Sequence, residues 1–568
     1  MALTGLAGRH SDAAPTAPPP AIELRGISKA FGPVQANRNI SIRIAKGTIH
    51  GIIGENGAGK STLMSILYGF YRADSGEILI NGRPTAIPNS QAAIRAGIGM
   101  VFQHFKLVHN FSVVENVILG AEEGALLRPS VDKARRLLAD LARDYELDVD
   151  PDALIEDLSV GHQQRVEILK ALYRHADILI LDEPTGVLTP DEADHLFRIL
   201  ANLRDQGKTI VLITHKLREI MEITENVSVM RRGEMVATVR TAETSPEQLA
   251  ELMVGRKVLL HVPKGPANPG RTVLEVRDLR VRDDQKVERL KGVSFAIRAG
   301  EILGIAGVAG NGQSELLAVL GGMTNGTGSV TLNGAALPLS GHGCNGRARR
   351  QAGIAHVPED RQHLGLILDF AAWENMAFGY QDDPAYQKNA LMMDNDALRR
   401  DAEGKIARFD VRPANCWLPA KSFSGGNQQK IVVAREIERR PDLLLVGQPT
   451  RGVDIGAIEF IHKQLVALRD AGKAVLLVSV ELDEIMSLSD RIAVMFDGRI
   501  MGERLPAETN ERELGLMMAG IPDAEARARA GSGAAAGAAG AAATATAAAA
   551  GAAGAAGPAG TAGTEAGA

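Results

Sequence analysis

One stretch of the chain reads Gly54-Glu55-Asn56-Gly57-Ala58-Gly59-Lys60-Ser61-Thr62. It fits the pattern G-x-x-x-x-G-K-[ST], in which glycines let the backbone curl so that its N–H groups point at phosphate oxygens. Lys60 would reach the β- and γ-phosphates, and the Ser61 hydroxyl would bind Mg²⁺. Residues 48–53 predict a buried strand before the loop, and residues 61–68 predict a helix after it. The stretch therefore predicts a phosphate-binding loop, and the alternative is a glycine-rich turn before a helix.

Composition bounds the class of protein. The 568 residues are enough for two to four domains, and the 45% hydrophobic and 23% charged residues are ordinary for a soluble globular protein. The net charge of −5 does not favour nucleic acid as a partner. Cys344 and Cys416 have no metal-binding spacing, which suggests packing roles and a reducing compartment. No apolar run is long enough for a membrane span and no secretory signal begins the chain, so any role at a membrane is expected through a partner.

Self-comparison shows that one unit occurs twice. Residues 22–25 return at 274–277, residues 51–62 at 304–315, and residues 219–221 at 484–486. The shift between the copies changes only from 252 residues at the start to 265 at the end (22 to 274, and 219 to 484). A shift this long indicates a duplicated domain rather than a short-period repeat.

The pattern predicts five segments. Residues 1–20 would be a flexible leader, 21–257 the first copy, 258–271 a linker rich in proline and glycine, and 272–520 the second copy. Residues 521–568 would be a disordered tail, since the chain beyond Pro522 has no Leu, Ile, Val or aromatic residue. Each copy begins with β-rich sequence and continues with alternating strands and helices. Residues 178–181 and 209–213 predict buried parallel strands, and 131–147 predict a helix.

Further residues of the first copy stand at the ends of these strands. Asp182 and Glu183 end the strand 178–181, His215 follows the strand 209–213, Gln103 follows Phe102, and Phe31 precedes Gly32. With the phosphate loop, they make the chain resemble the ATP-binding cassette (ABC) ATPases. More narrowly, the chain resembles the tandem ATPase subunits of simple-sugar and nucleoside importers, over about residues 21–520. The resemblance implies an α/β fold of two tandem P-loop domains, each with a RecA-like core, an antiparallel β subdomain and a helical insertion.

The resemblance also implies a role for each position. Asp182 would hold Mg²⁺ through water, and Glu183 would polarise the attacking water as general base. Gln103 would sense Mg²⁺ and the γ-phosphate, His215 would act as a switch, and Phe31 would stack on adenine. An acidic turn, a surface glutamine, an ordinary histidine and a core phenylalanine remain the respective alternatives. Together with the nine loop residues, these positions would bind ATP and Mg²⁺.

Two stretches resemble the ABC signature, L-S-G-G-Q, which grips a γ-phosphate from the opposite side. In the first copy, Val160 and His162 replace the third and fifth residues of a stretch beginning Leu158-Ser159. In the second copy, Phe423 is followed by Ser424, Gly425, Gly426 and Asn427, so both glycines are kept. A plain helix N-cap at Ser159 or Ser424 is the alternative.

The second copy differs where chemistry would occur. Gln313 replaces Lys60, Gly447 replaces Asp182, Gln448 replaces Glu183 and Val480 replaces His215, while Asp283 falls opposite Phe31 and Glu359 opposite Gln103. These changes remove a cation, a metal contact and a base. Glu359 could also repel phosphate. This copy is therefore expected to hydrolyse little or no ATP and to bind it poorly.

ABC domains pair head to tail, each ATP lying between the phosphate loop of one and the signature of the other. Pairing within the chain would form site one from the first-copy motifs with Ser424, Gly426 and Asp454. Site two would combine the altered second-copy positions with Val160, His162 and Thr189. The resemblance thus implies an intrachain pseudo-dimer with one competent and one degenerate ATP site.

The implied function is an import ATPase, peripheral on the cytoplasmic face of the cell membrane. Its implied partners are two membrane permease subunits, which would dock on the insertions at 105–157 and 361–420, and an extracytoplasmic solute-binding protein. Residues 447–454 and 158–172 resemble nucleoside-type subunits more than sugar-type ones. A sugar importer of the ribose or galactose kind is the alternative solute class. A soluble tandem ABC protein acting on ribosomes and a non-hydrolysing scaffold are the alternative classes of protein.

Overall fold

The structure is a computed structural model that describes residues 19–528 apart from 33, 103–104, 122–126, 187, 189, 260–261, 309 and 390–391. Gln103 and Thr189 lie outside the described residues, as do the leader up to residue 18 and the tail beyond residue 528. The predictions for these positions stay predictions.

The first copy contains two sheets. A small antiparallel sheet has the strand order β2-β1-β4-β5, and a six-stranded sheet has the order β10-β9-β3-β8-β7-β6. In the larger sheet only β10 is antiparallel to its neighbour, and β3 lies between β8 and β9. The phosphate loop after β3 therefore leaves from the middle of the sheet. The bounds are β1 (Ile22–Phe31), β2 (Val34–Ile44), β3 (Ile49–Gly54), β4 (Ser75–Ile80), β5 (Arg83–Pro84), β6 (Ile98–Val101), β7 (Ile178–Asp182), β8 (Thr209–Ile213), β9 (Asn226–Arg231) and β10 (Glu234–Arg240).

Helices pack around the larger sheet, and α3, α4 and α5 pack on one another as a helical layer at its side. The helix expected at 131–147 is α4, which starts four residues earlier and ends two residues earlier. The bounds are α1 (Lys60–Leu67), α2 (Ser90–Arg95), α3 (Val113–Ile118), α4 (Leu127–Tyr145), α5 (Val160–Tyr173), α6 (Pro190–Asp205), α7 (Leu217–Ile223) and α8 (Pro246–Val254).

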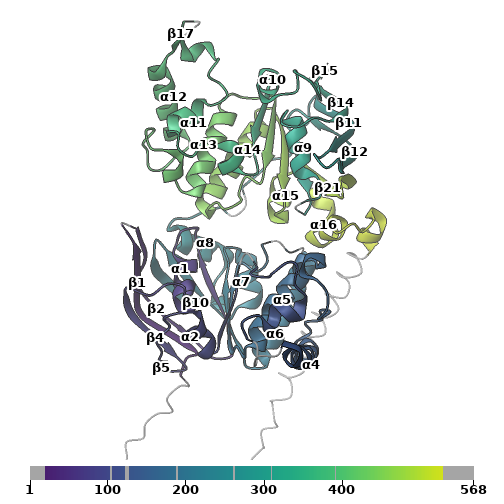
Figure 1. The fold of residues 1–568 in the computed structure, drawn as a ribbon. Helices are drawn as coiled ribbons and strands as arrows, with labels where there is room; N and C mark the ends of the chain where they lie inside the picture. Colours follow the sequence, from purple (N-terminus) through teal and green to yellow (C-terminus); the bar gives the residue numbers. More distant parts are fainter. Residues whose placement is uncertain are drawn as a thin grey trace, which may run out of the picture.

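The second copy repeats this arrangement. Its sheets have the orders β12-β11-β14-β15 and β16-β19-β20-β13-β21-β22, and a two-stranded hairpin, β17–β18, is added. The strands are β11 (Thr272–Arg282), β12 (Glu288–Arg298), β13 (Ile302–Ala306), β14 (Thr327–Leu332), β15 (Ala335–Ala336), β16 (Ile354–Val357), β17 (Gln387–Asn389), β18 (Met392–Met393), β19 (Leu443–Gly447), β20 (Ala474–Ser479), β21 (Arg491–Phe496) and β22 (Arg499–Arg504). The helices are α9 (Gln313–Leu320), α10 (Gly346–Gln351), α11 (Ala372–Ala377), α12 (Asn395–Arg408), α13 (Gly425–Ile437), α14 (Ile455–Asp470), α15 (Leu482–Leu488) and α16 (Glu511–Met518). Figure 1 shows the copies as two bodies, with α8 and α16 where they meet.

The sheet centres hold the core of each copy. Every residue of β3, β8, β13, β19 and β20 is buried. Parallel strands covered on both faces need nearly continuous apolar sequence, which is why runs such as residues 178–181 and 209–213 predicted them. The rigid sheet then fixes the loops at its carboxyl edge, where parallel α/β folds place their sites.

The ordered part of the second copy extends past residue 520, where the tail was expected to begin. Residues 523–528 are helical, Ala526 is fully buried, and Asp523 forms an ion pair with Arg504. The buried Ala526 and the ion pair of Asp523 help to hold this turn against the domain, and neither contact needs a bulky apolar residue.

Within the described ranges, no helix is both long and apolar enough to cross a membrane. The longest described helix, α4, has 19 residues and carries charged side chains along its length.

The buried imidazole of His50 predicts a loss of stability in acid. His50 lies in β3 with Nε2 2.8 Å from the Ser228 hydroxyl, and burial lowers its pKa to about 4. A lowered histidine pKa stabilises the fold above the unfolded pKa of about 6.5, and this contribution is lost as the pH falls toward 4. Between pH 7.5 and 5 the loss should reach about 2 kcal/mol. The free energy of unfolding in urea should be measured at both pH values. Its fall from pH 7.5 to pH 5 should be smaller by this amount in His50→Gln than in the unaltered chain.

The control for this prediction is His109→Gln, which changes an exposed histidine of the same copy. Its acid sensitivity should equal that of the unaltered chain. If the free energy of unfolding falls equally in His50→Gln and in the unaltered chain, His50 does not limit stability in acid.

Candidate functional site

The phosphate loop joins β3 to α1 with the backbone curl that its glycines predict. Gly57 has φ 81° and Gly59 has φ 97°, a region that favours glycine. A Cβ atom at Gly54 would lie 2.4 Å from the Met230 carbonyl oxygen, and one at Gly59 would lie 2.3 Å from that of Ala36. Any larger residue at these two positions would push the loop away from its supporting strands.

Lys60 begins α1 and folds back over the loop. Its Nζ donates to the carbonyl oxygens of Gly54 at 2.6 Å and Glu55 at 3.1 Å. Burial lowers the pKa of Lys60, while the charges of Glu183 and Asp182 oppose that shift. The ammonium group is therefore held by carbonyl oxygens of the loop and lies within electrostatic reach of the two acidic residues.

Glu183 and His215 form a direct contact at the carboxyl edge of the sheet. His215 Nδ1 lies 2.9 Å from Glu183 Oε1, as expected for a base and the side chain that orients it. Burial alone would raise the pKa of Glu183, but the hydrogen bond and charge of His215, with Lys60, outweigh it and hold the pKa below its usual value. Glu183 also has φ 48°, a strained conformation of the kind found at functional sites.

Asp182 and Ser61 bring two oxygen donors to one place. Asp182 ends β7, and Ser61 hydrogen-bonds to its carboxylate. Burial and the nearby Glu183 raise the pKa of Asp182, against the effects of Lys60 and Ser61. Carboxylate and hydroxyl oxygens are the hard ligands that Mg²⁺ prefers, so these two residues fit a magnesium ion bound with phosphate.

The remaining loop residues support this geometry. Asn56 and Gly57 are exposed at the turn, Ala58 is buried beneath it with its N–H bonded to the Glu55 carbonyl oxygen at 3.0 Å, and Thr62 lies in the first turn of α1. Phe31 ends β1 and is 41% exposed, so the alternative of a core phenylalanine is wrong. Its ring meets Tyr71 edge-on at 5.1 Å between centroids.

The second-copy signature is shaped by two glycines. Ser424 caps α13, and Asn427 donates to its hydroxyl at 2.8 Å. A Cβ atom at Gly425 would lie 2.5 Å from the Arg361 guanidinium, and one at Gly426 would lie 2.5 Å from the Asp454 carboxylate. Among the described residues, no hydrogen bond or ion pair joins Ser424 to the phosphate loop. The structure therefore brings the first-copy residues together and shows no direct polar contact between Ser424 and the phosphate loop among the described residues.

Asp454 nevertheless influences the first copy. Burial raises the pKa of Glu55 to about 7, and the charge of Asp454 adds to that shift, while Arg232, Arg231 and Arg256 oppose it. A second-copy carboxylate thus lies within electrostatic reach of the first-copy phosphate loop, which is the pairing that the sequence predicts for site one.

Glu55 predicts a pH dependence of ATP binding. Below pH 7 its carboxyl is mostly protonated, and above pH 7 it places a negative charge beside Lys60 and the phosphates. The affinity for ATP should therefore fall several-fold, on the order of tenfold at most, as the pH rises from 6 to 8. Calorimetric titration of Glu55→Gln at the same pH values should remove this part of the dependence and leave only the titration of ATP itself. The role of Glu55 is contradicted if the affinity for ATP changes equally with pH in Glu55→Gln and in the unaltered chain. It is also contradicted if the exposed-site control Glu77→Gln alters this pH dependence.

The contacts between the copies were not found from the sequence. Lys216 and Glu481 form an ion pair of 3.2 Å, Arg256 and Glu459 one of 2.8 Å, and Arg218 pairs with Glu511. In addition, α8 packs on α14, and α16 packs on α6.

These contacts follow a pseudo-two-fold relation. The shift of 265 residues that relates the copies takes α6 to α14, and it takes Lys216 to Glu481. Equivalent residues that contact each other lie on the symmetry axis of an isologous interface. Opposite charges at equivalent positions were the signal that self-comparison could have used.

The altered positions of the second copy have contacts of their own. The Ser314 hydroxyl donates to Glu359 at 2.6 Å, and Gln448 Oε1 accepts from the Val480 N–H at 3.3 Å. Gln448 has φ 46°, close to that of Glu183. The second copy therefore keeps the backbone of the first at this edge while its side chains differ.

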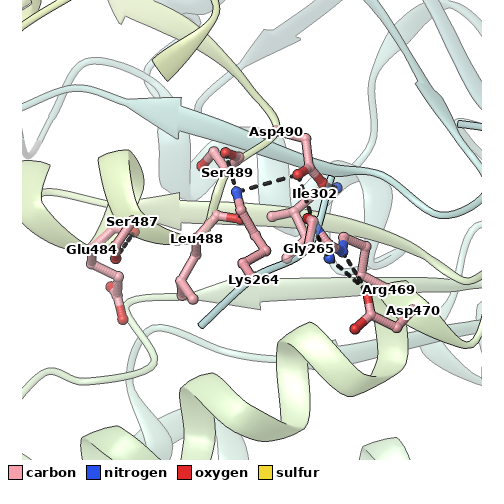
Figure 2. Close-up of polar contacts among 10 residues, drawn as sticks. All are labelled: Lys264, Gly265, Ile302, Arg469, Asp470, Glu484, Ser487, Leu488, Ser489 and Asp490. Atoms are coloured by element: carbon pink, nitrogen blue, oxygen red, sulfur yellow. Dashed lines mark hydrogen bonds and ion pairs between the residues drawn. The ribbon is translucent and has the colours of Figure 1, made fainter. Parts of the chain in front are cut away.

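The linker is bonded to the second copy (Figure 2). Lys264 Nζ donates to the carbonyl oxygens of Leu488 at 2.9 Å and Ser489 at 2.6 Å, and pairs with Asp490 at 3.2 Å. Arg469 bonds both Asp490 and the Gly265 carbonyl oxygen. These contacts fix residues 264–265 to the start of β21 and the end of α14.

Comparison with known proteins gives consistent results. The sequence model described as ABC transporter matches residues 37–186 and 290–451. The nucleoside import ATP-binding protein NupA of Lactococcus lactis subsp. cremoris is 47% identical over 502 residues, covering 88% of this chain and 98% of that protein. The guanosine import ATP-binding protein NupO of Bacillus subtilis is 48% identical over 506 residues, covering 89% and 98%. A glucose import ATP-binding protein of Haloferax volcanii is 43% identical over 543 residues, covering 90% and 98%.

Proposed function

The chain belongs to the ABC transporter family and is an ATPase coupled to solute import, and from this premise we propose that it powers the uptake of nucleosides. The proposal on the solute is supported by two relatives named for nucleoside and guanosine import. The glucose import relative, at 43% identity, keeps a sugar importer as the second candidate.

Site one, at the first-copy phosphate loop, performs the hydrolysis. The observation that carries this proposal is the contact of 2.9 Å between His215 and Glu183, beside Lys60 and Asp182. Glu183, held as a carboxylate, accepts a proton from the attacking water, and His215 fixes its orientation. Lys60 neutralises charge on the phosphates, and the exposed ring of Phe31 stacks on the base. Ser61, Asp182 and Gln103 would hold Mg²⁺, which would supply charge neutralisation at the phosphates.

Closure of the two copies completes site one. Ser424, Gly425, Gly426 and Asn427 then approach the γ-phosphate from the second copy, with α13 directing its N-terminus at the anion. The electrostatic reach from Asp454 to Glu55 supports this pairing. Binding of ATP favours the closed state and hydrolysis releases it, which gives the two-state motion that drives a transporter.

The partners are two membrane permease subunits and an extracytoplasmic solute-binding protein. The chain is peripheral to the membrane at its cytoplasmic face through these partners. The permease subunits dock on the helical insertions, and exposed Leu119 and Phe378 follow α3 and α11 at equivalent places in the two insertions. A soluble role on ribosomes is disfavoured by the short linker and the net charge of −5.

Uptake in cells carrying Lys60→Ala tests the proposal. Labelled purine nucleosides, ribose and glucose are supplied side by side, and nucleoside uptake alone should be lost. Loss of ribose or glucose uptake alone would move the chain to the sugar importers with the same ATPase mechanism. Unchanged uptake of all three would contradict both solute classes.

A further inference from the structure

Each copy has a surface cavity where the edge strand of its larger sheet meets the end of a helix. In the first copy these elements are β6 and α5, and in the second copy they are β16 and α13. The shift of 265 residues takes Arg174, in the wall of the first cavity, to Arg439, in the wall of the second. The cavities have volumes of about 30 Å³ and about 120 Å³. They are therefore equivalent in place but not in size.

Both cavities border the exposed apolar residues that the proposed docking uses. Arg174 donates to the carbonyl oxygen of Leu119 at 2.5 Å. In the second copy, a Cβ atom at Gly379, which follows Phe378, would lie 2.7 Å from the guanidinium carbon of Arg350. Protein interfaces combine apolar contacts with polar groups that need matching partners. A permease segment that covers Leu119 or Phe378 therefore meets the polar groups of the cavity beside it.

The first cavity contains an acceptor without a partner. Glu167, in its wall, is 1% exposed. Its Oε1 accepts from the Lys106 N–H and from Lys170 Nζ, each at 2.8 Å. Within the described part of the chain, its Oε2 has no hydrogen-bond partner. A buried acceptor left unpaired costs free energy, which a donor on a docked segment would recover.

The second cavity has the opposite polarity. Its wall carries three arginines where the first copy has Ile94, Arg174 and His175, and these are Arg350, Arg439 and Arg440. The guanidinium groups of Arg350 and Arg439 lie 5.3 Å and 4.7 Å from the centre of the Tyr380 ring. Arg439 Nε is buried without a hydrogen-bond partner. Among the residues that the structure describes, neither Arg350 nor Arg440 forms an ion pair.

The carboxylates near the second cavity are already bonded. Asp442, in its wall, accepts from Lys473 at 2.9 Å and from Asn333 at 3.0 Å. Glu436 attracts Arg350, but it already accepts from two other groups at 2.7 Å each, the Arg435 guanidinium and the Tyr380 hydroxyl. The position of the first-copy carboxylate is held by Val432. The wall therefore keeps unpaired guanidinium donors, which a carboxylate would match.

We propose that the two cavities distinguish two different membrane permease subunits by charge. The second-copy cavity accepts a segment that presents a carboxylate to Arg350 and Arg440, and the first-copy cavity accepts a segment that presents a hydrogen-bond donor to Glu167. Exchange of the segments would place a carboxylate against Glu167 and cover the arginines without a partner, and both effects oppose binding. The inference rests on the proposed docking of permease subunits, and it adds that the two subunits differ and that each has one place.

Site-specific cross-linking on the assembled transporter tests this assignment. The photoreactive residue p-benzoylphenylalanine replaces Leu119 in one preparation and Phe378 in another, so that the probes stand beside the two cavities. The probe at 119 should link to one permease subunit and the probe at 378 to the other. The peptide linked at 378 should contain an aspartate or a glutamate. Linkage of the same subunit at both positions would overturn the proposal.

Removal of charge tests the recognition itself. Arg350→Gln combined with Arg440→Gln should lower the amount of the subunit linked at 378 about tenfold or more, while the other subunit changes less than about twofold. Glu167→Gln should show the reverse selectivity, since its amide keeps the shape of the side chain but removes the charge. Retention of the other subunit shows that each variant is folded. The control Arg347→Gln removes a positive charge from the helix of Arg350 outside the cavity wall, and it should change neither subunit.

Two further variants keep the test independent of folding. Arg440→Gln alone, at an exposed side chain, should lower the amount of the same subunit several-fold. Arg350→Lys with Arg440→Lys keeps the charge and should retain more of that subunit than the glutamine pair. Equal loss of both subunits, or of neither, in the glutamine pair would overturn recognition by charge. Nucleoside uptake and the ATPase rate report on the import proposal, so its failure would appear in those assays and not in the pattern of linkage.

Discussion

Replacing Lys60 with alanine should lower the ATPase rate about 100-fold, a loss of roughly 3 kcal/mol of transition-state stabilisation. The ammonium group bonds to the phosphate loop within electrostatic reach of Asp182 and Glu183, where it would counter charge that develops on the transferred phosphoryl group. The rate is measured on the chain assembled with its permease subunits, at saturating ATP.

Gln313→Ala is the matched control, because Gln313 stands at the equivalent position of the second copy. The ATPase rate of Gln313→Ala should change by less than about twofold, because the second-copy site has no general base and contributes little hydrolysis. The assignment of hydrolysis to site one is wrong if Gln313→Ala abolishes turnover and Lys60→Ala leaves it intact.

Glu183→Gln should reduce hydrolysis about 1,000-fold or more while ATP still binds. The amide keeps the shape of the side chain but cannot accept the proton of the attacking water. Single-turnover hydrolysis and nucleotide affinity, measured on the same preparation, separate chemistry from binding. Gln448→Ala, the counterpart in the second copy, should leave the hydrolysis rate within about twofold.

The pH profile adds a test of the contact between His215 and Glu183. Because His215 helps to lower the pKa of Glu183, His215→Ala should move the acidic limb of the remaining activity to higher pH. An unmoved acidic limb in His215→Ala, with Glu183→Gln still inactive, would indicate that His215 acts without tuning the carboxylate.

The fold followed from the sequence because its strongest signals are local. Glycines in the loop, apolar strands such as 209–213 and the long-range repeat all specify backbone structure, and the tandem P-loop α/β fold is confirmed. The sequence assigned Ser61, Asp182, Glu183 and His215 to one site, and the structure places them together because neighbouring parallel strands bring their carboxyl ends to one edge.

The contacts that could not be predicted from the sequence depend on packing between residues far apart in the chain. The contact of Glu359 with Ser314 arises because Gly447 leaves space at a neighbouring strand end, and a residue-by-residue comparison of copies does not contain that space. The ion pair between Lys216 and Glu481 likewise joins residues 265 positions apart. The ion pair of Asp523 and the burial of Ala526 also support the helical turn at residues 523–528, and the composition of the tail signals neither.

Because Lys264 is bonded to the second copy, the segment that joins the two copies is short, and dilution of the protein does not separate them. Only eight residues, 256–263, separate Gly255, at the end of α8, from Lys264, and such a segment spans about 30 Å when fully extended. A tether of this length keeps each copy at a local concentration on the order of millimolar relative to the other. The proposed opening and closing of the two domains would therefore be a unimolecular step, with a rate that does not depend on the concentration of the protein in the cell.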